Sequence, residues 1–484
     1  MDITSLTAVE LGKKIKAKEI SVVEAVKASI AQIEKVEKDV NSFVTLDKEG
    51  ALKRAEEVQK LIDDGKLTGP LAGVPVAIKD NMCTQGMLTT CSSKILGNFQ
   101  PMFTAEAVKN LEAAGAVILG KTNMDEFAMG STTETSYFGP TKNPWNLEHV
   151  PGGSSGGSCA AVAAEEAPYA LGSDTGGSIR QPSSFCGVTG LKPTYGRVSR
   201  YGLVAFASSL DQIGPIARSA EDCGMILNAI AGYDPHDGTV SKNPVDDYTS
   251  KIGMSMKGVK IAVPAEFYAE GIDDVVRKTV LAAADSYKAM GAELVECSMP
   301  SLKYAVAAYY LISSAEASSN LSRYDGIKYG HRSDIVGNYS ELVTASRSEG
   351  FGDEVKRRIL LGNYALCSGY YDAYYGKAMA LKQKIREEYA EIFEKCDIIL
   401  TPTAPTVAYG AHENISDPKK MYQADICTVT VNIASLPAIS TTCGYDDKGM
   451  PIGMSLIGRM WNEAEIIGAA DAFEKSFSRK PANI

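Results

Sequence analysis

Two glycine-rich segments, each carrying a serine, are the part of this sequence whose composition could support covalent chemistry. Residues 151–158 read PGGSSGGS, and residues 172–180 read GSDTGGSIR. Glycines allow positive φ angles and a close approach of backbone N–H groups to a reacting atom. Such groups can stabilise the oxyanion that forms when a serine attacks a carbonyl carbon. The second segment offers an oxyanion hole of consecutive N–H groups, those of Thr175, Gly176, Gly177 and Ser178.

Other interpretations of these segments are weaker. A phosphate-binding loop would need Gly-x-x-x-x-Gly-Lys-Ser/Thr, or Gly-x-Gly-x-x-Gly after a strand, and neither pattern is present. Asp174-Thr-Gly resembles half of an aspartic-protease dyad, but that chemistry needs a second carboxylate, and no second Asp-Thr-Gly occurs. Two purely structural turns would explain either segment alone but explain both together poorly. The sequence therefore favours a serine nucleophile.

A serine nucleophile needs a base, and the sequence offers a lysine more readily than a histidine. Only four histidines occur, none in a recognisable motif, although His149 lies near the first glycine-rich segment. Lys79 directly follows the apolar run 74–78. It is therefore expected at the end of a strand, where α/β folds place their active sites. Lys121 follows a similar run, so the position alone does not identify the base.

Lys79 can act as a base at neutral pH only if its amine is deprotonated. Lowering the pKa of a lysine from about 10.4 to about 7 costs on the order of 4–5 kcal/mol. Desolvation in a dry pocket can lower the pKa of a lysine by that amount. A buried lysine that is hydrogen-bonded through one serine hydroxyl to a second serine would form a proton relay.

The elements that must position these residues alternate between strands and helices. Helices are predicted in the first fifty residues, where Thr7–Glu10 and Ser21–Glu24 have the capping-box pattern. Beyond them, short apolar runs lie at 74–78, 116–119, 167–171, 259–263 and 293–296, and helical stretches at 104–114, 159–164 and 274–290. Alternation of this kind predicts strands that helices cover on both faces.

No interdomain linker and no internal repeat are evident, so one large compact α/β domain is expected. Polar, turn-rich stretches at 234–256, 322–340 and 409–420 are predicted loops. One long helical segment is predicted from about 364 to 395. It carries four tyrosines whose spacing favours packing or interface contacts over base stacking: Tyr370, Tyr371, Tyr374 and Tyr375.

The composition is that of a globular protein. Of the 484 residues, 45% are hydrophobic and 22% charged, which excludes disorder and a fibrous repeat. The net charge of −10 argues against this surface binding a nucleic-acid backbone, which needs an excess of Lys and Arg. No targeting signal and no run of about 18 apolar residues are evident, so no membrane span is expected. The ten cysteines include no Cys-x-x-Cys pair, which predicts buried, reduced thiols in a cytoplasmic protein.

Lys79, the GGSSGG segment and the DTGGSIR segment together resemble the pattern of the amidase signature family, whose catalytic triad is Ser–Ser–Lys. The resemblance implies that Ser178 is the acyl-forming nucleophile, that Ser154 is the bridging serine after a cis peptide bond, and that Lys79 is the base. It is strongest over residues 70–215, which include the motif SLDQIGP at 209–215, and it extends more loosely over nearly the whole chain.

The resemblance also implies a fold. A single large α/β domain is expected over residues 1–484, with a central mixed β-sheet that helices cover on both faces. Within it, residues 1–65 are expected to form an N-terminal helical segment, residues 70–215 the catalytic core, and residues 300–440 the substrate-binding portion.

Within this family, the chain most resembles the A subunits of tRNA-dependent amidotransferases. The matching segments include GDEVKRR at 352–358 and MYQAD at 421–425. The resemblance implies glutamine as the ammonia donor, with Arg358 on its α-carboxylate, Asp425 on its α-ammonium group and Tyr309 beside them. A guanidinium can bind a carboxylate through two parallel hydrogen bonds.

The same resemblance implies partner subunits. Ammonia would travel to a tRNA-binding partner, which uses ATP and Mg²⁺ to convert Glu-tRNA(Gln) to Gln-tRNA(Gln), and in some systems Asp-tRNA(Asn) to Asn-tRNA(Asn). A third, small subunit would stabilise the pair. No cofactor and no metal site are implied for this chain. Two alternatives stay open: a stand-alone amidase that acts on simple amides, and a catalytically silent scaffold or nucleotide-binding protein.

Overall fold

The computed structural model describes residues 2–269, 271–335, 337–413 and 418–484. Its strands are β1 (Phe43–Leu46), β2 (Pro75–Lys79), β3 (Val117–Thr122), β4 (Tyr169–Asp174), β5 (Thr189–Lys192), β6 (Gln212–Ala217), β7 (Lys260–Pro264), β8 (Glu293–Cys297), β9 (Ile398–Pro402), β10 (Ala438–Tyr445) and β11 (Pro451–Ile457). Over the described ranges they form one eleven-stranded sheet in the order β1-β3-β2-β4-β6-β5-β10-β11-β9-β7-β8. The sheet is mixed, because β2 runs parallel to β3 and β4 whereas β4 runs antiparallel to β6.

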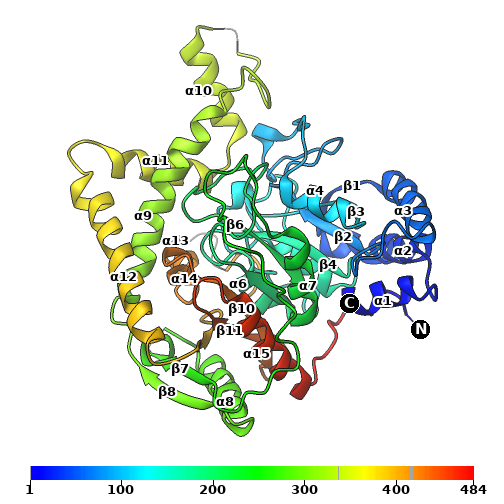
Figure 1. Ribbon diagram of the computed structural model, residues 1–484. Helices are drawn as coiled ribbons and strands as arrows, with labels where there is room; N and C mark the ends of the chain where they lie inside the picture. Colours follow the sequence, from blue (N-terminus) through cyan, green and yellow to red (C-terminus); the bar gives the residue numbers. More distant parts are fainter. Residues whose placement is uncertain (1, 270, 336, 414–417) are drawn as a thin grey trace.

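Helices lie on both faces of this sheet (Figure 1). They are α1 (Ala8–Lys16), α2 (Val22–Val40), α3 (Lys48–Asp63), α4 (Glu106–Ala113), α5 (Gly156–Ala163), α6 (Arg180–Cys186), α7 (Ala220–Ile230), α8 (Asp274–Ala289), α9 (Leu302–Asn320), α10 (Tyr339–Gly350), α11 (Asp353–Leu366), α12 (Lys377–Phe393), α13 (Pro418–Gln423), α14 (Val429–Ile433) and α15 (Glu463–Ser476). The predicted α/β class, with a mixed sheet between helices, is therefore confirmed.

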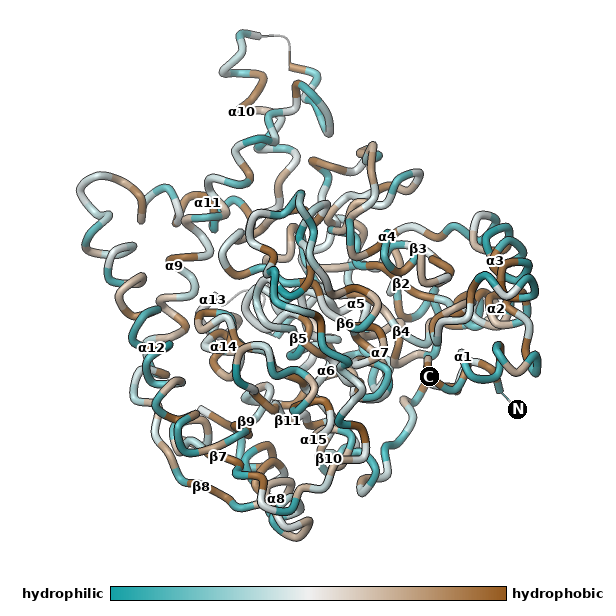
Figure 2. The backbone as a smooth tube through the Cα atoms, viewed as in Figure 1, coloured by the Kyte–Doolittle hydropathy of each residue, from teal (hydrophilic) through white to brown (hydrophobic). Residues whose placement is uncertain are grey.

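Most of the inner strands of the sheet are buried along their whole length. Every residue of β2, β4, β6, β9 and β11 is buried. A strand that is covered on both faces must be apolar on both sides, so it reads as a continuous apolar run rather than an alternating one. Figure 2 shows hydrophobic residues along these strands and hydrophilic ones on outer helices such as α3.

The N-terminal helices begin where the sequence predicts. The Thr7 backbone N–H donates to the Glu10 carboxylate at 2.9 Å, and the Ser21 N–H donates to the Glu24 carboxylate at 2.8 Å. In both cases the hydroxyl accepts a hydrogen bond from the N–H of the glutamate, which completes the capping box. Both predicted capping boxes are confirmed.

The prediction of a single helix from about 364 to 395 is wrong. α11 ends at Leu366, and α12 begins only at Lys377, after a π-helical turn over Asp372–Gly376. Gly369 lies in the interruption between the two helices. A glycine inside a helix destabilises it by about 1 kcal/mol relative to alanine. Three of the tyrosines there are exposed, so packing does not compensate: Tyr370, Tyr371 and Tyr374. Their role in an interface stays a prediction.

The predicted loops are irregular where the structure describes them. Residues 234–256 contain neither helix nor strand. α10 and α13 begin within the last residues of the other two predicted loops, at Tyr339 and Pro418. Residue 336 and residues 414–417 of these loops lie outside the described residues.

Two further expectations concern the membrane and the cysteines. Across the described ranges, none of the helices combines the length and the apolar character that a membrane span needs. All ten cysteines are free, and eight of them are buried, whereas Cys297 is half-buried and Cys367 is exposed. The prediction of buried, unpaired thiols is therefore confirmed for most of the cysteines.

Helix α5 lies so close to neighbouring backbone that one of its positions admits only glycine. A Cβ atom at Gly157 would meet the carbonyl oxygens of Asn123 and Ser42 at 2.4 and 2.6 Å. These two segments are themselves joined by a hydrogen bond from the Asn123 N–H to the Ser42 carbonyl oxygen at 2.7 Å. Neither can therefore move away without losing that bond.

We expect Gly157→Ala to lower the free energy of unfolding by about 2–3 kcal/mol, because the added methyl group overpacks a rigid contact. Gly69→Ala is the matched control, since nothing lies within 4 Å of a Cβ at that position. Denaturant unfolding followed by circular dichroism measures both variants. Equal stability of the two variants would contradict the described packing of α5.

Candidate active site

Lys79 is the last residue of β2, and its amine ends in a buried cluster of serine hydroxyls. Its Nζ lies 2.8 Å from Ser154 Oγ, 2.8 Å from Ser155 Oγ and 3.0 Å from Ser173 Oγ. The side chain is 0% exposed. The strand end predicted from the sequence thus brings the proposed base into contact with the proposed bridging serine.

Burial lowers the pKa of Lys79 to about 7. The carboxylates of Asp125 and Asp174 act in the opposite direction and raise it, but among the described residues neither forms a salt bridge with Lys79. The surrounding hydroxyls are neutral, so they replace only part of the hydration that the charged amine loses. A large fraction of Lys79 is therefore the neutral amine near pH 7, as general base catalysis requires.

Among the described residues, neither of the other candidate bases forms a hydrogen bond with the two serines. The Nζ of Lys121 donates to the Met82 carbonyl oxygen at 2.6 Å and to the Thr89 hydroxyl at 2.9 Å, and it lies 3.7 Å from a carboxylate oxygen of Asp80. The Nδ1 atom of His149 has no hydrogen-bond partner within the described part of the chain. The geometry therefore favours Lys79.

Ser155 is not among the predicted site residues, yet it helps to set the direction of the Lys79 lone pair. Its hydroxyl donates to the Ser173 carbonyl oxygen at 3.1 Å, so it can only accept from the amine. A neutral amine has two N–H donors and one lone pair. Ser155 Oγ accepts one N–H group, which leaves the second N–H group and the lone pair to Ser154 Oγ and Ser173 Oγ.

Asp174, the last residue of β4, anchors the second glycine-rich segment. Its carboxylate accepts hydrogen bonds from Arg180 Nε (3.0 Å) and Nη2 (3.1 Å), from the backbone N–H groups of Gly177 (2.9 Å) and Ile179 (3.2 Å), and from the Asn432 amide (2.8 Å). Burial alone would raise the pKa of Asp174, but the Arg180 guanidinium holds it at about 2. Asp174 is therefore a charged anchor and not the proton-sharing acid of a protease dyad.

This network turns the chain so that Ser178 lies against the first glycine-rich segment. The Ser155 backbone N–H donates to the Ser178 carbonyl oxygen at 3.0 Å, and the Gly153–Ser154 peptide bond is cis. Ser178 is 7% exposed, whereas Ser154 is 0% exposed, so substrate can reach only the former. Within the described chain no hydrogen bond joins the two hydroxyls, so the second half of the relay stays a prediction.

One of the four N–H groups predicted for the oxyanion hole has another partner. The N–H of Gly177 is directed at Asp174, at a φ of 136° that favours glycine. The predicted oxyanion hole therefore narrows to Thr175, Gly176 and Ser178. At Gly176, a Cβ atom would meet the Tyr309 hydroxyl oxygen at 2.5 Å, so glycine allows this loop to approach the predicted substrate-binding residues.

The three predicted substrate-binding residues gather around the ring of Tyr310, which was not predicted. The Arg358 guanidinium lies 4.4 Å from the centroid of that ring, and the ring of Tyr309 lies 5.0 Å from it. Asp425 Oδ2 accepts the Tyr310 hydroxyl at 2.6 Å. Arg358 and Asp425 are 2% and 9% exposed. A positive and a negative side chain, both buried, thus contact one tyrosine.

Both charges of this cluster are available to a ligand. Burial raises the pKa of Asp425 to about 6, although the Tyr310 and Ser131 hydroxyls, which donate to its carboxylate, act against the shift. Asp425 is therefore ionised above about pH 6. Among the described residues, Arg358 uses only its Nε in hydrogen bonding, so its two terminal nitrogens are free. The side chain of Arg357, in contrast, is 45% exposed.

Side chains join this cluster to the glycine-rich segments. The Thr428 hydroxyl donates to the Gly176 carbonyl oxygen at 2.6 Å. Gln181 accepts from the Gly153 N–H at 2.9 Å and donates to the carbonyl oxygen of Ser131, the residue that binds Asp425. A ligand held between Arg358 and Asp425 would therefore lie beside the loop that carries the proposed nucleophile.

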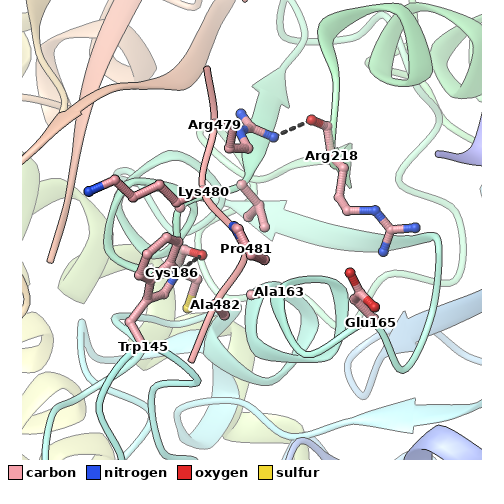
Figure 3. A pocket seen from close by; sticks show the side chains of 11 residues that line it. Trp145, Ala163, Glu165, Cys186, Arg218, Arg479, Lys480, Pro481 and Ala482 are labelled. Carbon is pink, nitrogen blue, oxygen red and sulfur yellow. Dashed lines mark hydrogen bonds between the residues drawn. The ribbon is translucent and has the colours of Figure 1, made fainter. Parts of the chain in front are cut away.

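Cys159 and Cys186 pack near the site without taking part in it. Burial raises the pKa of the Cys159 thiol to about 12, and it also raises that of Cys186. Cys186 lines a cavity of about 240 Å³ with Trp145 and the C-terminal segment around Pro481 (Figure 3). Both thiols are therefore neutral, and none of the three proposed catalytic residues lines that cavity.

Comparison with known proteins identifies close relatives. The family model described as Amidase matches residues 24–467. Among the A subunits of glutamyl-tRNA(Gln) amidotransferases, that of Agathobacter rectalis is 61% identical to this chain, over 100% of this chain and 96% of that protein. The protein of the same name from Lachnoclostridium phytofermentans is 56% identical, over 98% of each chain. The crystal structure of the Thermotoga maritima protein of that name matches with a TM-score of 0.82 and 40% identity, over 100% of this chain and 99% of that one.

The buried amine predicts a pH-dependent reactivity of Ser178. A small sulfonyl fluoride should label Ser178 at a rate that rises with pH through about 7 and is constant above it, because only neutral Lys79 accepts the proton of the attacking hydroxyl. Mass spectrometry of the peptide that contains Ser178 measures the rate. Lys79→Ala should lower it by about 10²–10⁴-fold, whereas replacing the exposed Lys142 by alanine should not change it. An inflection near the ordinary lysine pKa of about 10.4 would contradict the account.

Proposed function

This chain belongs to the amidase family, and on that premise we propose that it is the glutaminase subunit of a tRNA-dependent amidotransferase. It hydrolyses glutamine at the Ser–Ser–Lys site and releases ammonia for a partner subunit. The names of relatives that are 61% and 40% identical over the full chain support this assignment. The length of the match supports a role for the whole chain and not for one part of it.

The observation that carries the proposal is the pair of opposite charges beside the nucleophile loop. Free glutamine has an α-carboxylate and an α-ammonium group, and both need partners in a site that excludes water. The two free nitrogens of the Arg358 fork suit the carboxylate. The carboxylate of Asp425 suits the ammonium group. A simple amide would need neither side chain, so burying this pair would only destabilise an enzyme that acts on simple amides.

The first half of the reaction forms an ester. Ser178 Oγ attacks the side-chain carboxamide carbon of glutamine, and its proton passes through the Ser154 hydroxyl to the neutral amine of Lys79. Backbone N–H groups of Thr175, Gly176 and Ser178 stabilise the oxyanion of the tetrahedral intermediate. The carbon–nitrogen bond then breaks as the same relay returns the proton to the leaving nitrogen, and ammonia departs.

The second half of the reaction regenerates the enzyme. Water attacks the glutamyl ester, and the relay takes a proton from the water. The bond between the carbonyl carbon and Ser178 Oγ breaks, and the proton returns to that oxygen. Glutamate leaves with both of its α-substituents unchanged. The site thus converts one glutamine and one water to one glutamate and one ammonia, and the chain itself needs no cofactor for this step.

The ammonia is used by a partner. A second subunit binds tRNA and uses ATP with Mg²⁺ to amidate Glu-tRNA(Gln), and in some systems Asp-tRNA(Asn), while a third, small subunit stabilises the pair. The net charge of −10 fits a chain that leaves tRNA to its partner. The complex acts in the cytoplasm, which suits the free cysteines.

The proposed site takes its catalytic and its substrate-binding side chains from different parts of the chain. Residues 1–65 form the N-terminal segment, which is mostly helical but also contains the edge strand β1, and residues 70–215 form the catalytic core that supplies Lys79, Ser154 and Ser178. Residues 300–440 form the substrate-binding portion, which supplies three further residues: Tyr309, Arg358 and Asp425.

Reconstitution tests this function. The chain, co-expressed with its partner subunits, should produce Gln-tRNA from Glu-tRNA, ATP and glutamine. Ser178→Ala should abolish the reaction with glutamine but retain it with ammonium chloride, because free ammonia bypasses the glutaminase site. If the chain instead purifies alone and hydrolyses simple amides as well as glutamine, the stand-alone amidase is the correct function. If Ser178→Ala has no effect, the site is catalytically silent.

Arg358 and Asp425 form the proposed substrate clamp. Replacing Arg358 should change the binding of glutamine without changing the chemical step. We expect Arg358→Ala to raise the KM for glutamine by roughly tenfold to a hundredfold, since charge-assisted hydrogen bonds contribute about 1.5–3 kcal/mol. Hydrolysis of a neutral amide such as propionamide should be unaffected. Lys356→Ala is the control: its side chain is 41% exposed and pairs with the exposed Asp353, so we expect less than about a fivefold change. Unchanged steady-state kinetics for glutamine in Arg358→Ala would contradict the assignment.

A further inference from the structure

A second carboxylate lies beside the clamp, and the proposed reaction does not use it. Glu354 belongs to α11, one turn before Arg358, and is 6% exposed. Its Oε1 accepts the Arg358 Nε–H at 2.6 Å and the Tyr422 hydroxyl at 3.0 Å. Its other carboxylate oxygen accepts a hydrogen bond from Arg357. Both oxygens of a buried acid are thus directed at neighbouring side chains.

Two tyrosines connect this acid to the rest of the clamp. The rings of Tyr310 and Tyr422 are stacked, with centroids 3.8 Å apart and an interplanar angle of 24°. Tyr310 donates its hydroxyl to Asp425 at 2.6 Å, and Tyr422 donates its hydroxyl to Glu354 at 3.0 Å. The Arg358 guanidinium lies 4.4 Å from the Tyr310 centroid and 5.0 Å from that of Tyr422. Each tyrosine therefore contacts the guanidinium and one of the two carboxylates.

These contacts fix the plane of the Arg358 guanidinium and leave its terminal nitrogens without a partner among the described residues. The tyrosine rings hold it by cation–π contact, and the hydrogen bond to Glu354 stops rotation about the Nε end. Among the residues that the structure describes, no hydrogen bond uses Arg358 Nη1 or Nη2. A carboxylate that binds in a forked manner needs two parallel N–H groups in one plane. Only an arginine whose plane is fixed in advance binds it without a further loss of side-chain entropy.

We propose that Glu354 and Tyr422 are positioning residues for substrate recognition, which hold the plane of Arg358 so that its terminal nitrogens face the α-carboxylate of the substrate. This inference rests on the proposed function, because it takes glutamine as the substrate. Neither residue touches the substrate or the reacting atoms. Together with Tyr310, they make the site favour amides that carry an α-carboxylate.

A purely structural role for Glu354 is the alternative, because residues four apart on a helix often form stabilising pairs. The two roles differ in what a variant changes. Loss of a positioning residue raises the KM for glutamine and leaves reactions without an α-carboxylate unchanged. Loss of a structural residue lowers kcat and the labelling of Ser178 together, because the loops that contact the clamp also move.

Steady-state glutaminase kinetics of the chain in complex with its partner subunits provide the test. We expect Glu354→Ala to raise the KM for glutamine about tenfold or more while kcat changes less than about twofold. Tyr422→Phe keeps the stacked ring and removes only the hydroxyl, so a smaller rise is expected. Glu354→Gln retains an acceptor for the Nε–H and should restore part of the affinity. Labelling of Ser178 by a small neutral sulfonyl fluoride should be the same in all three variants.

Asp353→Ala is the matched control, since its side chain is 91% exposed and pairs only with Lys356 at the start of the same helix. An unchanged KM in both Glu354→Ala and Tyr422→Phe would overturn the proposal, as would a parallel loss of kcat and labelling. If Glu354→Ala does not fold, the KM of Tyr422→Phe for glutamine tests the proposal: a rise supports it and an unchanged value overturns it. A wild-type complex that consumes no glutamine would overturn the proposed function itself, and this inference with it.

Discussion

The proposed activity depends on a lysine that is buried and, among the described residues, has no salt-bridge partner. Moving the pKa of Lys79 from its ordinary value to about 7 costs about 5 kcal/mol, since each pKa unit corresponds to 1.36 kcal/mol. A salt bridge would lower this cost but would also keep the amine protonated and inactive. Three serine hydroxyls contact the amine instead. Burial therefore lowers local stability but leaves an amine that is largely neutral near pH 7, as the proposed base requires.

Among the described residues, the carboxylates near that amine form no salt bridge with it, and the rest of the site holds two loops against it. Asp174, the nearest strong acid in the second loop, is neutralised by Arg180 and by backbone N–H groups. The close approach of helix α5 to the backbone around Asn123 fixes the first loop. The charges proposed to bind substrate lie around Tyr310 and Tyr422, beside Gly176. Separate sets of residues are thus available for the proposed proton transfer and for recognition.

Much of this arrangement could be predicted from the sequence, because strand ends and glycine-rich loops have local signatures. The strand before Lys79 and both capping boxes are examples. Ser155, Tyr310 and Glu354 could not be found in this way, since their roles arise from contacts between segments distant in the chain. The direction of the Gly177 N–H depends on the Asp174 side chain three residues away, a local contact that the composition of the loop does not reveal. The interruption between α11 and α12 was missed because tyrosines continue the helical spacing through a glycine.

The protonation state of Lys79 in the folded protein is the most direct test of this account. Nuclear magnetic resonance of protein labelled with ¹³C at the lysine ε carbon reports it, with Lys79→Met identifying the resonance. The account predicts one lysine whose chemical shift titrates with a midpoint near pH 7, well below the others. A Lys79 resonance that stays in the protonated position until the ordinary lysines titrate would contradict it.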